Sequence, residues 1–165
     1  MVGQNFLVLL LVAVGGIQLA HCADGQLTFF YSYAPCCPSN PNYDPNADTT
    51  ECDLYGACKN PGFFVGIGQQ TLEYVRSNDL ASIYDDRDPS NNNFSSYVNK
   101  LIRISKNGRN ATARIVDYCA NEDCDGCCSE LAQPSGYDIE LEYYTCIKYY
   151  GTIDECDGTI TWDVV

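Results

Sequence analysis

Two runs of alternating apolar and polar residues, joined by Asn107-Gly108, form the clearest pattern in the chain. The runs cover residues 101–105 and 111–118. Asn-Gly between such runs favours a two-residue type I′ turn, because both residues tolerate a positive φ. The pattern therefore predicts a β-hairpin with one buried face. We expect these side chains on that face: Ile102, Ile104, Ala111, Ala113 and Ile115.

Apolar runs elsewhere predict further strands and two short helices. We expect strands over residues 26–33, 63–67 and 80–84, and helices over residues 69–77 and 142–150. Gly151 follows the second helix at the position that ends it. Trp162 is expected in the core, with its indole N–H hydrogen-bonded. Residues 34–62 are rich in Cys, Pro, Asn and Asp, so they predict a long loop that is held by disulfides or serves a function.

In residues 137–142, acidic residues alternate with aliphatic ones. Two aliphatic residues separate three acidic ones, which are Asp138, Glu140 and Glu142. If the segment is a strand, the three carboxylates share one face and disturb one another's ionisation. Such a group is a candidate for proton transfer or for hydrogen bonding to a ligand, although a crowd of carboxylates does not by itself imply catalysis.

Residues 1–22 have the pattern of a secretory signal peptide. An apolar run covers residues 6–14, and Ala20 and Cys22 stand at positions −3 and −1 of a cleavage site. The apolar run is too short and too interrupted by glycine to predict a membrane span. We therefore expect a secreted, extracellular protein whose single domain covers residues 23–165.

Ten cysteines follow residue 22, and an even number in a secreted chain predicts five disulfides. They are Cys36, Cys37, Cys52, Cys58, Cys119, Cys124, Cys127, Cys128, Cys146 and Cys156. The spacing leaves their pairing open. The alternative for Cys124-Asp-Gly-Cys127 is a zinc or redox site, but no histidine follows residue 22. We expect neither a metal nor a cofactor.

Three segments resemble, in the same order, strands of the double-psi β-barrel superfamily. They are Leu27–Tyr31, Ala113–Cys119 with the following Cys124-Asp-Gly-Cys127, and Asp157–Val165. The superfamily includes expansins, barwin-like defence proteins, rare lipoprotein A-like domains and family 45 glycoside hydrolases. The resemblance implies a mainly β fold, namely a six-stranded double-psi β-barrel with short helices and disulfide-stapled loops.

The resemblance also implies a ligand groove. The residues implied to bind the ligand are Tyr31, Asp117, Tyr118, Tyr137 and Asp138. Tyrosine rings in such a groove suit stacking on sugar rings. The hydrolases carry a catalytic Asp in a His-Phe-Asp-Leu-type motif, and the matching residues here are Asp138-Ile-Glu140-Leu. The resemblance therefore makes Glu140 the candidate acid.

The hydrolases also need a second carboxylate on or just after the first strand, where it activates water. Here Tyr31 is followed by Ser-Tyr-Ala-Pro-Cys, and the next acidic residue is Asp44. We therefore expect an expansin-like module that binds cell-wall or extracellular polysaccharide without hydrolysis. Two alternatives stay open: a glycan-cleaving enzyme that uses Glu140, and a protein-binding defence or protease-inhibitor module.

The net charge of −13 narrows the choice of partners. Such acidity argues against nucleic acid, anionic membranes and polyanionic glycans. It is compatible with a neutral polysaccharide and favours a basic protein as the alternative partner. We expect a monomer. Asn93 and Asn110 begin Asn-x-Ser/Thr sequences and are expected N-glycosylation sites if the source is eukaryotic.

Overall fold

The computed structural model describes residues 22–53, 56–90 and 92–165. The predicted signal peptide, residues 1–22, therefore lies outside the described residues except for Cys22, which is exposed. β1 begins at the next residue, Ala23. In the described part of the chain, no helix is both long enough and apolar enough to cross a bilayer.

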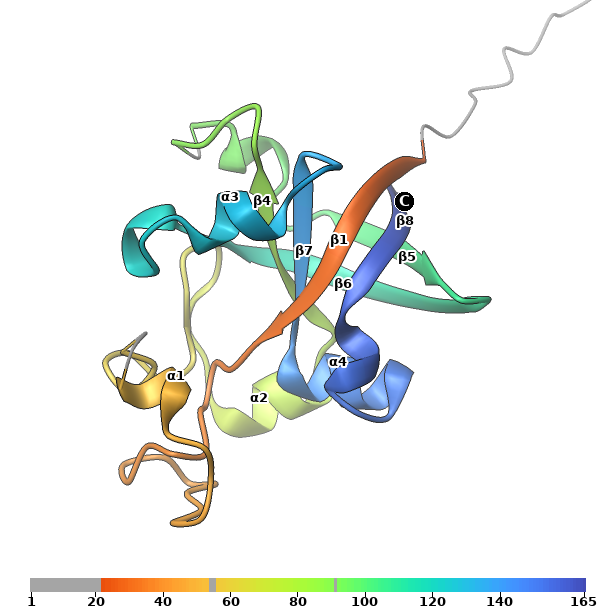
Figure 1. The fold of residues 1–165 in the computed structure, drawn as a ribbon. Helices are drawn as coiled ribbons and strands as arrows, with labels where there is room; N and C mark the ends of the chain where they lie inside the picture. Colours follow the sequence, from red (N-terminus) through yellow and green to blue (C-terminus); the bar gives the residue numbers. More distant parts are fainter. Residues whose placement is uncertain (1–21, 54–55, 91) are drawn as a thin grey trace, which may run out of the picture.

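Six strands close into a barrel in the order β1-β7-β4-β6-β5-β8 (Figure 1). Their bounds are β1 Ala23–Phe30, β4 Leu80–Asp85, β5 Leu101–Lys106, β6 Arg109–Tyr118, β7 Tyr137–Glu142 and β8 Gly158–Val164. β1 is parallel to β7 and β4 is parallel to β6, whereas the other neighbours are antiparallel. This mainly β, mixed barrel confirms the predicted fold class and is compatible with a double-psi topology.

Short elements cover the barrel and its ends. The helices are α1 Thr50–Asp53, α2 Leu72–Ser77, α3 Cys127–Leu131 and α4 Tyr143–Tyr150, with 3₁₀ turns at Phe94–Ser96, Asn121–Asp123 and Asp154–Cys156. β2 (Phe63–Phe64) and β3 (Gly68–Gln69) form a separate small sheet. α4 ends at Gly151 as predicted, because its φ of 91° suits a residue without a Cβ.

The predicted hairpin is formed by β5 and β6. Asn107 and Gly108 have φ angles of 51° and 78°, as a type I′ turn requires. The five apolar side chains expected on one face are fully buried in the barrel interior. Leu27, Ile139 and Leu141 from other strands pack against them. The alternation predicts this hairpin correctly because each barrel strand has only an inner and an outer face.

A β-bulge turns Asp117 towards the outside of the barrel. Ala81 pairs with Ile115, but the next residue, Ser82, pairs with Asp117. Val116 is therefore the extra residue, with no partner in the register with β4. Ile115 points into the barrel core, and strict alternation would place Asp117 there as well. The extra residue re-aims the carboxylate, as bulges do beside many functional sites.

Three expectations from the sequence are wrong. β1 ends at Phe30 and not at residue 33, because Tyr33 packs with Phe64 in a second apolar cluster outside the barrel interior. The strand expected over residues 63–67 is only two residues long, since the chain turns back at once into β3. Trp162 is buried in the core, but its Nε1–H has no acceptor among the described residues.

The ten cysteines that follow Cys22 form the predicted five disulfides. The pairs are Cys36–Cys52, Cys37–Cys58, Cys119–Cys128, Cys124–Cys127 and Cys146–Cys156. The largest separation along the sequence is 21 residues, so every disulfide closes a local loop. Two of them hold the long loop, as expected. Five disulfides are typical of a protein from an oxidising compartment.

Candidate functional site

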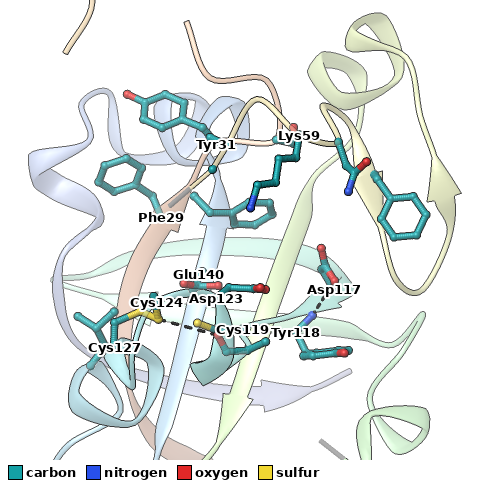
Figure 2. A pocket seen from close by; sticks show the side chains of 18 of the residues that line it. Phe29, Tyr31, Lys59, Asp117, Tyr118, Cys119, Asp123, Cys124, Cys127 and Glu140 are labelled. Carbon is teal, nitrogen blue, oxygen red and sulfur yellow. Dashed lines mark hydrogen bonds between the residues drawn. A yellow bond between two sulfur atoms is a disulfide. The ribbon is translucent and has the colours of Figure 1, made fainter. Parts of the chain in front are cut away.

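A surface cavity of about 680 Å³ lies beside the barrel, where the long loop faces the ends of β1 and β6 (Figure 2). Its lining comes from residues 29–32, 56–63 and 117–131 and from Glu140 of β7. These segments meet because β1, β7, β4 and β6 are neighbours in the barrel. Four of the predicted site residues line the cavity: Tyr31, Asp117, Tyr118 and Glu140.

The strand register places Glu140 and Asp117 on either side of Ser82. In β4, Ser82 pairs with Glu140 on one side and with Asp117 on the other. Ala81 and Ile83 belong to the barrel core, so Ser82 points outward with the two carboxylates. Adjacent strands lie about 4.8 Å apart, so the backbones of Glu140 and Asp117 are about 10 Å apart. The buried Oγ of Ser82 has no hydrogen-bond partner among the residues that the structure describes.

Two backbone amides hold the Asp117 carboxylate. Its Oδ1 accepts hydrogen bonds from the N–H of Val65 at 3.2 Å and from the N–H of Tyr118 at 3.0 Å. The Gly66 N–H donates to the Val116 carbonyl at 2.8 Å, which fastens the β2–β3 turn to the bulge. Burial raises the pKa of Asp117 to about 6, although both amides oppose the shift. This carboxyl group therefore titrates close to neutral pH.

Aromatic side chains line the side of the cavity opposite Glu140. Figure 2 shows Phe29 and Tyr31 on the side opposite Glu140. The Tyr31 ring stacks on Tyr143 with centroids 4.9 Å apart, and Phe29 packs on it edge-on at 5.6 Å. Tyr118 is held in the same way by a neighbouring ring, 5.1 Å away. Because neighbours already fix these rings, they lose little freedom when a ligand binds.

Three charged residues that the sequence pattern does not predict also line the cavity: Lys59, Asp123 and Glu130. Lys59 belongs to the long loop, and the other two flank the Cys124–Cys127 disulfide. In Figure 2 the Lys59 side chain extends towards the side that carries Glu140 and Asp123. None of the three lies in a strand, so alternation says nothing about their direction. The clustered cysteines were the available sign that these segments are held in place.

Tyr137 and Asp138, two of the predicted ligand residues, do not line this cavity. Tyr137 packs edge-on against Trp162 with centroids 5.0 Å apart, and the Arg87 guanidinium lies 4.6 Å from its ring centre. Asp138 is fully buried and accepts a hydrogen bond from the Thr28 hydroxyl at 3.0 Å. Burial, followed by the charge of a neighbouring carboxylate, raises the pKa of Asp138 to about 8. Both residues therefore contribute to the packing of the barrel.

Glu142, the third carboxylate of β7, holds structure together. It is 1% exposed and accepts a hydrogen bond from the Ser32 hydroxyl at 2.8 Å. Its other oxygen caps α4 by accepting from the Tyr144 N–H at 2.8 Å. Burial raises the pKa of Glu142 to about 7 against these hydrogen bonds. The alternation of β7 is confirmed, since Ile139 and Leu141 are in the core, but only Glu140 reaches the cavity.

The remaining predicted sites are the two N-glycosylation sites and the alternative zinc site. Asn93 and Asn110 are both exposed, and neither lines the cavity, so their glycosylation stays a prediction. Among the described residues, three cysteine sulfurs come within metal-binding reach of one another in two places. All of these cysteines are in disulfides. Cys124 and Cys127 are bonded to each other and so do not offer the thiolates of the alternative zinc site.

No protein-family model matches the sequence, and a search of curated proteins finds no match. The chemistry of the cavity is therefore inferred from its own residues. They offer hydrogen-bond acceptors, aromatic rings and one ammonium group within a single concave surface. Such a combination is typical of sites for small polar molecules and for segments of polymers.

Proposed function

We propose that this chain is a secreted, expansin-like module that binds cell-wall or extracellular polysaccharide in this cavity without hydrolysing it. The observation that supports the proposal is one cavity that is lined by both aromatic side chains and carboxylates. Sugar rings have C–H faces that pack on aromatic rings, and they have hydroxyls that donate to carboxylates. The cavity supports both kinds of contact at once.

The end of β1 supports the non-hydrolytic part of the proposal. In the family 45 hydrolases that the sequence resembles, this region supplies the carboxylate that activates water. Here the lining residues from this segment are Phe29, Phe30, Tyr31 and Ser32, none of which is acidic. The Ser32 hydroxyl binds Glu142, whose other oxygen caps α4, so that carboxylate is already engaged.

Calorimetric titration with soluble glucan and chitin oligomers tests the proposal on the protein with intact disulfides. Asp117→Asn should weaken binding by about 1.5–3 kcal/mol, because a charged acceptor is lost. Glu140→Gln also replaces a charged acceptor by an amide oxygen, so it should weaken binding by a comparable amount. Asp24→Asn is a matched control, because Asp24 is exposed on β1 and does not line the cavity. If neither cavity variant alters binding, the cavity is not the binding surface.

Cleavage of the bound glycan is the second candidate function, and the environment of Asp117 favours it. A carboxyl group with a pKa of about 6 keeps a proton in mild acid and can donate it to a glycosidic oxygen. Glu140 lies two strands away and would serve as the base that activates a water molecule. New reducing ends that vanish in Asp117→Asn and Glu140→Gln would replace binding by catalysis as the function.

A further inference from the structure

Negative charges outnumber positive ones around the cavity. The charged residues of the lining are Asp117, Asp123, Glu130, Glu140 and Lys59. A neutral glycan uses carboxylates only as hydrogen-bond acceptors, and it does nothing to relieve the repulsion between them. A cation that binds among them relieves that repulsion and is attracted by each carboxylate. The overall charge of −13 acts in the same direction.

Ser82 adds an independent observation on the strand between two of these carboxylates, although it does not itself line the cavity. Its residue is 2% exposed, and its Oγ has no hydrogen-bond partner among the described residues. The register directs it outward between Glu140 and Asp117. Buried hydroxyls are normally hydrogen-bonded, so one that lacks a protein partner is open to a bound water or to a ligand group. A donor that enters between the two carboxylates reaches this hydroxyl only by passing between their side chains.

An ammonium group fits this arrangement better than a hydroxyl does. It carries three donors and no acceptor, whereas the ionised carboxylates around it only accept. The aromatic rings on the opposite side add to the fit, because ring faces attract cations as well as the C–H faces of sugars. A lysine side chain brings the ammonium group without a flat C–H face for Tyr31. A pyranose ring that carries a protonated amine brings both.

We infer that the cavity prefers polysaccharides with free amino groups, of which β-1,4-linked glucosamine is the simplest, over neutral polymers with the same backbone. The inference rests on the proposed function, because it assumes that a glycan occupies the cavity. The 2-ammonium group lies between Glu140 and Asp117, and the sugar ring packs on Tyr31. Lys59 repels the ammonium group and therefore limits the affinity.

Three oligosaccharides of equal length test this preference, because they differ only at carbon 2. They are the β-1,4-linked oligomers of glucosamine, N-acetylglucosamine and glucose, titrated near neutral pH, above the Asp117 pKa of about 6, so that the carboxylate is charged while part of the amine is still protonated. The glucosamine oligomer should bind at least about tenfold more tightly than the other two, as expected for hydrogen bonds between charged groups. Added salt should weaken the binding of this oligomer alone.

Two variants should move the preference in opposite directions. Glu140→Gln should reduce the advantage of the glucosamine oligomer to about threefold or less, since one of its charged partners is lost. Lys59→Gln should tighten the binding of the glucosamine oligomer, because a like charge is removed. Asp24→Asn changes the net charge as much as Glu140→Gln does, but it lies away from the cavity and should leave the advantage unchanged.

The outcomes separate this inference from the proposed function. Equal binding of all three oligomers would leave the proposed function standing and overturn the inference. If none of them binds, both are wrong. If a lysine-rich peptide of equal charge binds as tightly as the glucosamine oligomer, the cavity attracts cations in general and the inference fails. The same holds if Asp24→Asn weakens binding as much as Glu140→Gln does.

Discussion

Asp117, Asp138 and Glu142 are acidic side chains that the fold keeps from water. Their pKa values rise to about 6, 8 and 7, and burial is the largest cause for each. In the unfolded chain such groups titrate near pH 4. The folded protein therefore holds these protons at pH values where the unfolded chain has released them. Proton binding and folding are linked for this reason.

We predict that the free energy of unfolding falls as the pH rises from about 4.5 to about 8. Over this range the folded state binds more protons than the unfolded state, so the slope is negative, and stability levels off above the folded pKa values. Denaturant unfolding at a series of pH values measures the slope. Glu142→Gln cannot ionise and still accepts from the Tyr144 N–H, so it should reduce the fall by about 1–3 kcal/mol. An unchanged fall would mean that Glu142 ionises in contact with water.

Among the elements, the β2–β3 turn determines where the acidic group of β6 points. Its Gly66 lies so close to the bulge that an added Cβ would be 2.6 Å from the Val116 carbonyl oxygen and 2.4 Å from Val98 Cγ2. The first contact is with backbone, which cannot move aside cheaply. The same turn supplies the Val65 N–H that holds the Asp117 carboxylate. This small sheet therefore links the packing of the loop to the geometry of the cavity.

Gly66→Ala should push this turn away from the bulge. We expect a loss of about 1–3 kcal/mol in stability, as for other overpacked sites, and weaker glycan binding because Asp117 loses a fixed donor. Val65→Ala is the matched control, since its side chain is exposed and its backbone N–H is retained. Thermal unfolding and titration of both variants measure the two effects. Equal behaviour of the two variants would show that the turn does not position Asp117.

The elements that could be predicted from the sequence are those with local causes. The β5–β6 hairpin follows from alternation and from Asn107-Gly108, and α4 stops where Gly151 stands. The bulge at Val116 could not be predicted, because it depends on the pairing of β6 with β4, a strand distant in sequence. Lys59 was missed for a similar reason, since only the folded loop brings it to the cavity. The register between strands that are distant in the sequence thus cannot be predicted from a single sequence.

At the scale of the whole molecule, the disulfides differ in how deeply they lie. Cys146 and Cys156 are fully buried in the barrel core, whereas Cys124 and Cys127 are partly exposed at the cavity. Thiol–disulfide exchange requires that the attacking thiolate reach a sulfur atom. The order in which the disulfides are reduced therefore shows which of them the folded protein shields from the attacking thiolate.

Mild reduction followed by alkylation should label Cys124 and Cys127 before Cys146 and Cys156. Mass spectrometry of peptides taken at successive times gives the order. The buried pair should become reactive only when the barrel itself unfolds, so its labelling should follow the loss of β-sheet signal. Early labelling of Cys146 or Cys156 would contradict its place in the core.

The local closure of every disulfide separates ligand choice from folding. One wall of the cavity is cross-linked within residues 36–58 and the other within residues 119–128, and no disulfide joins the two walls or binds one strand of the barrel to another. Strand pairing and the apolar interior, to which only the Cys146–Cys156 disulfide belongs, close the barrel without the four disulfides of the walls. Each wall is thus a separately cross-linked loop. Its sequence can change, in evolution or by protein engineering, so that the ligand changes while the strand register of the barrel is kept.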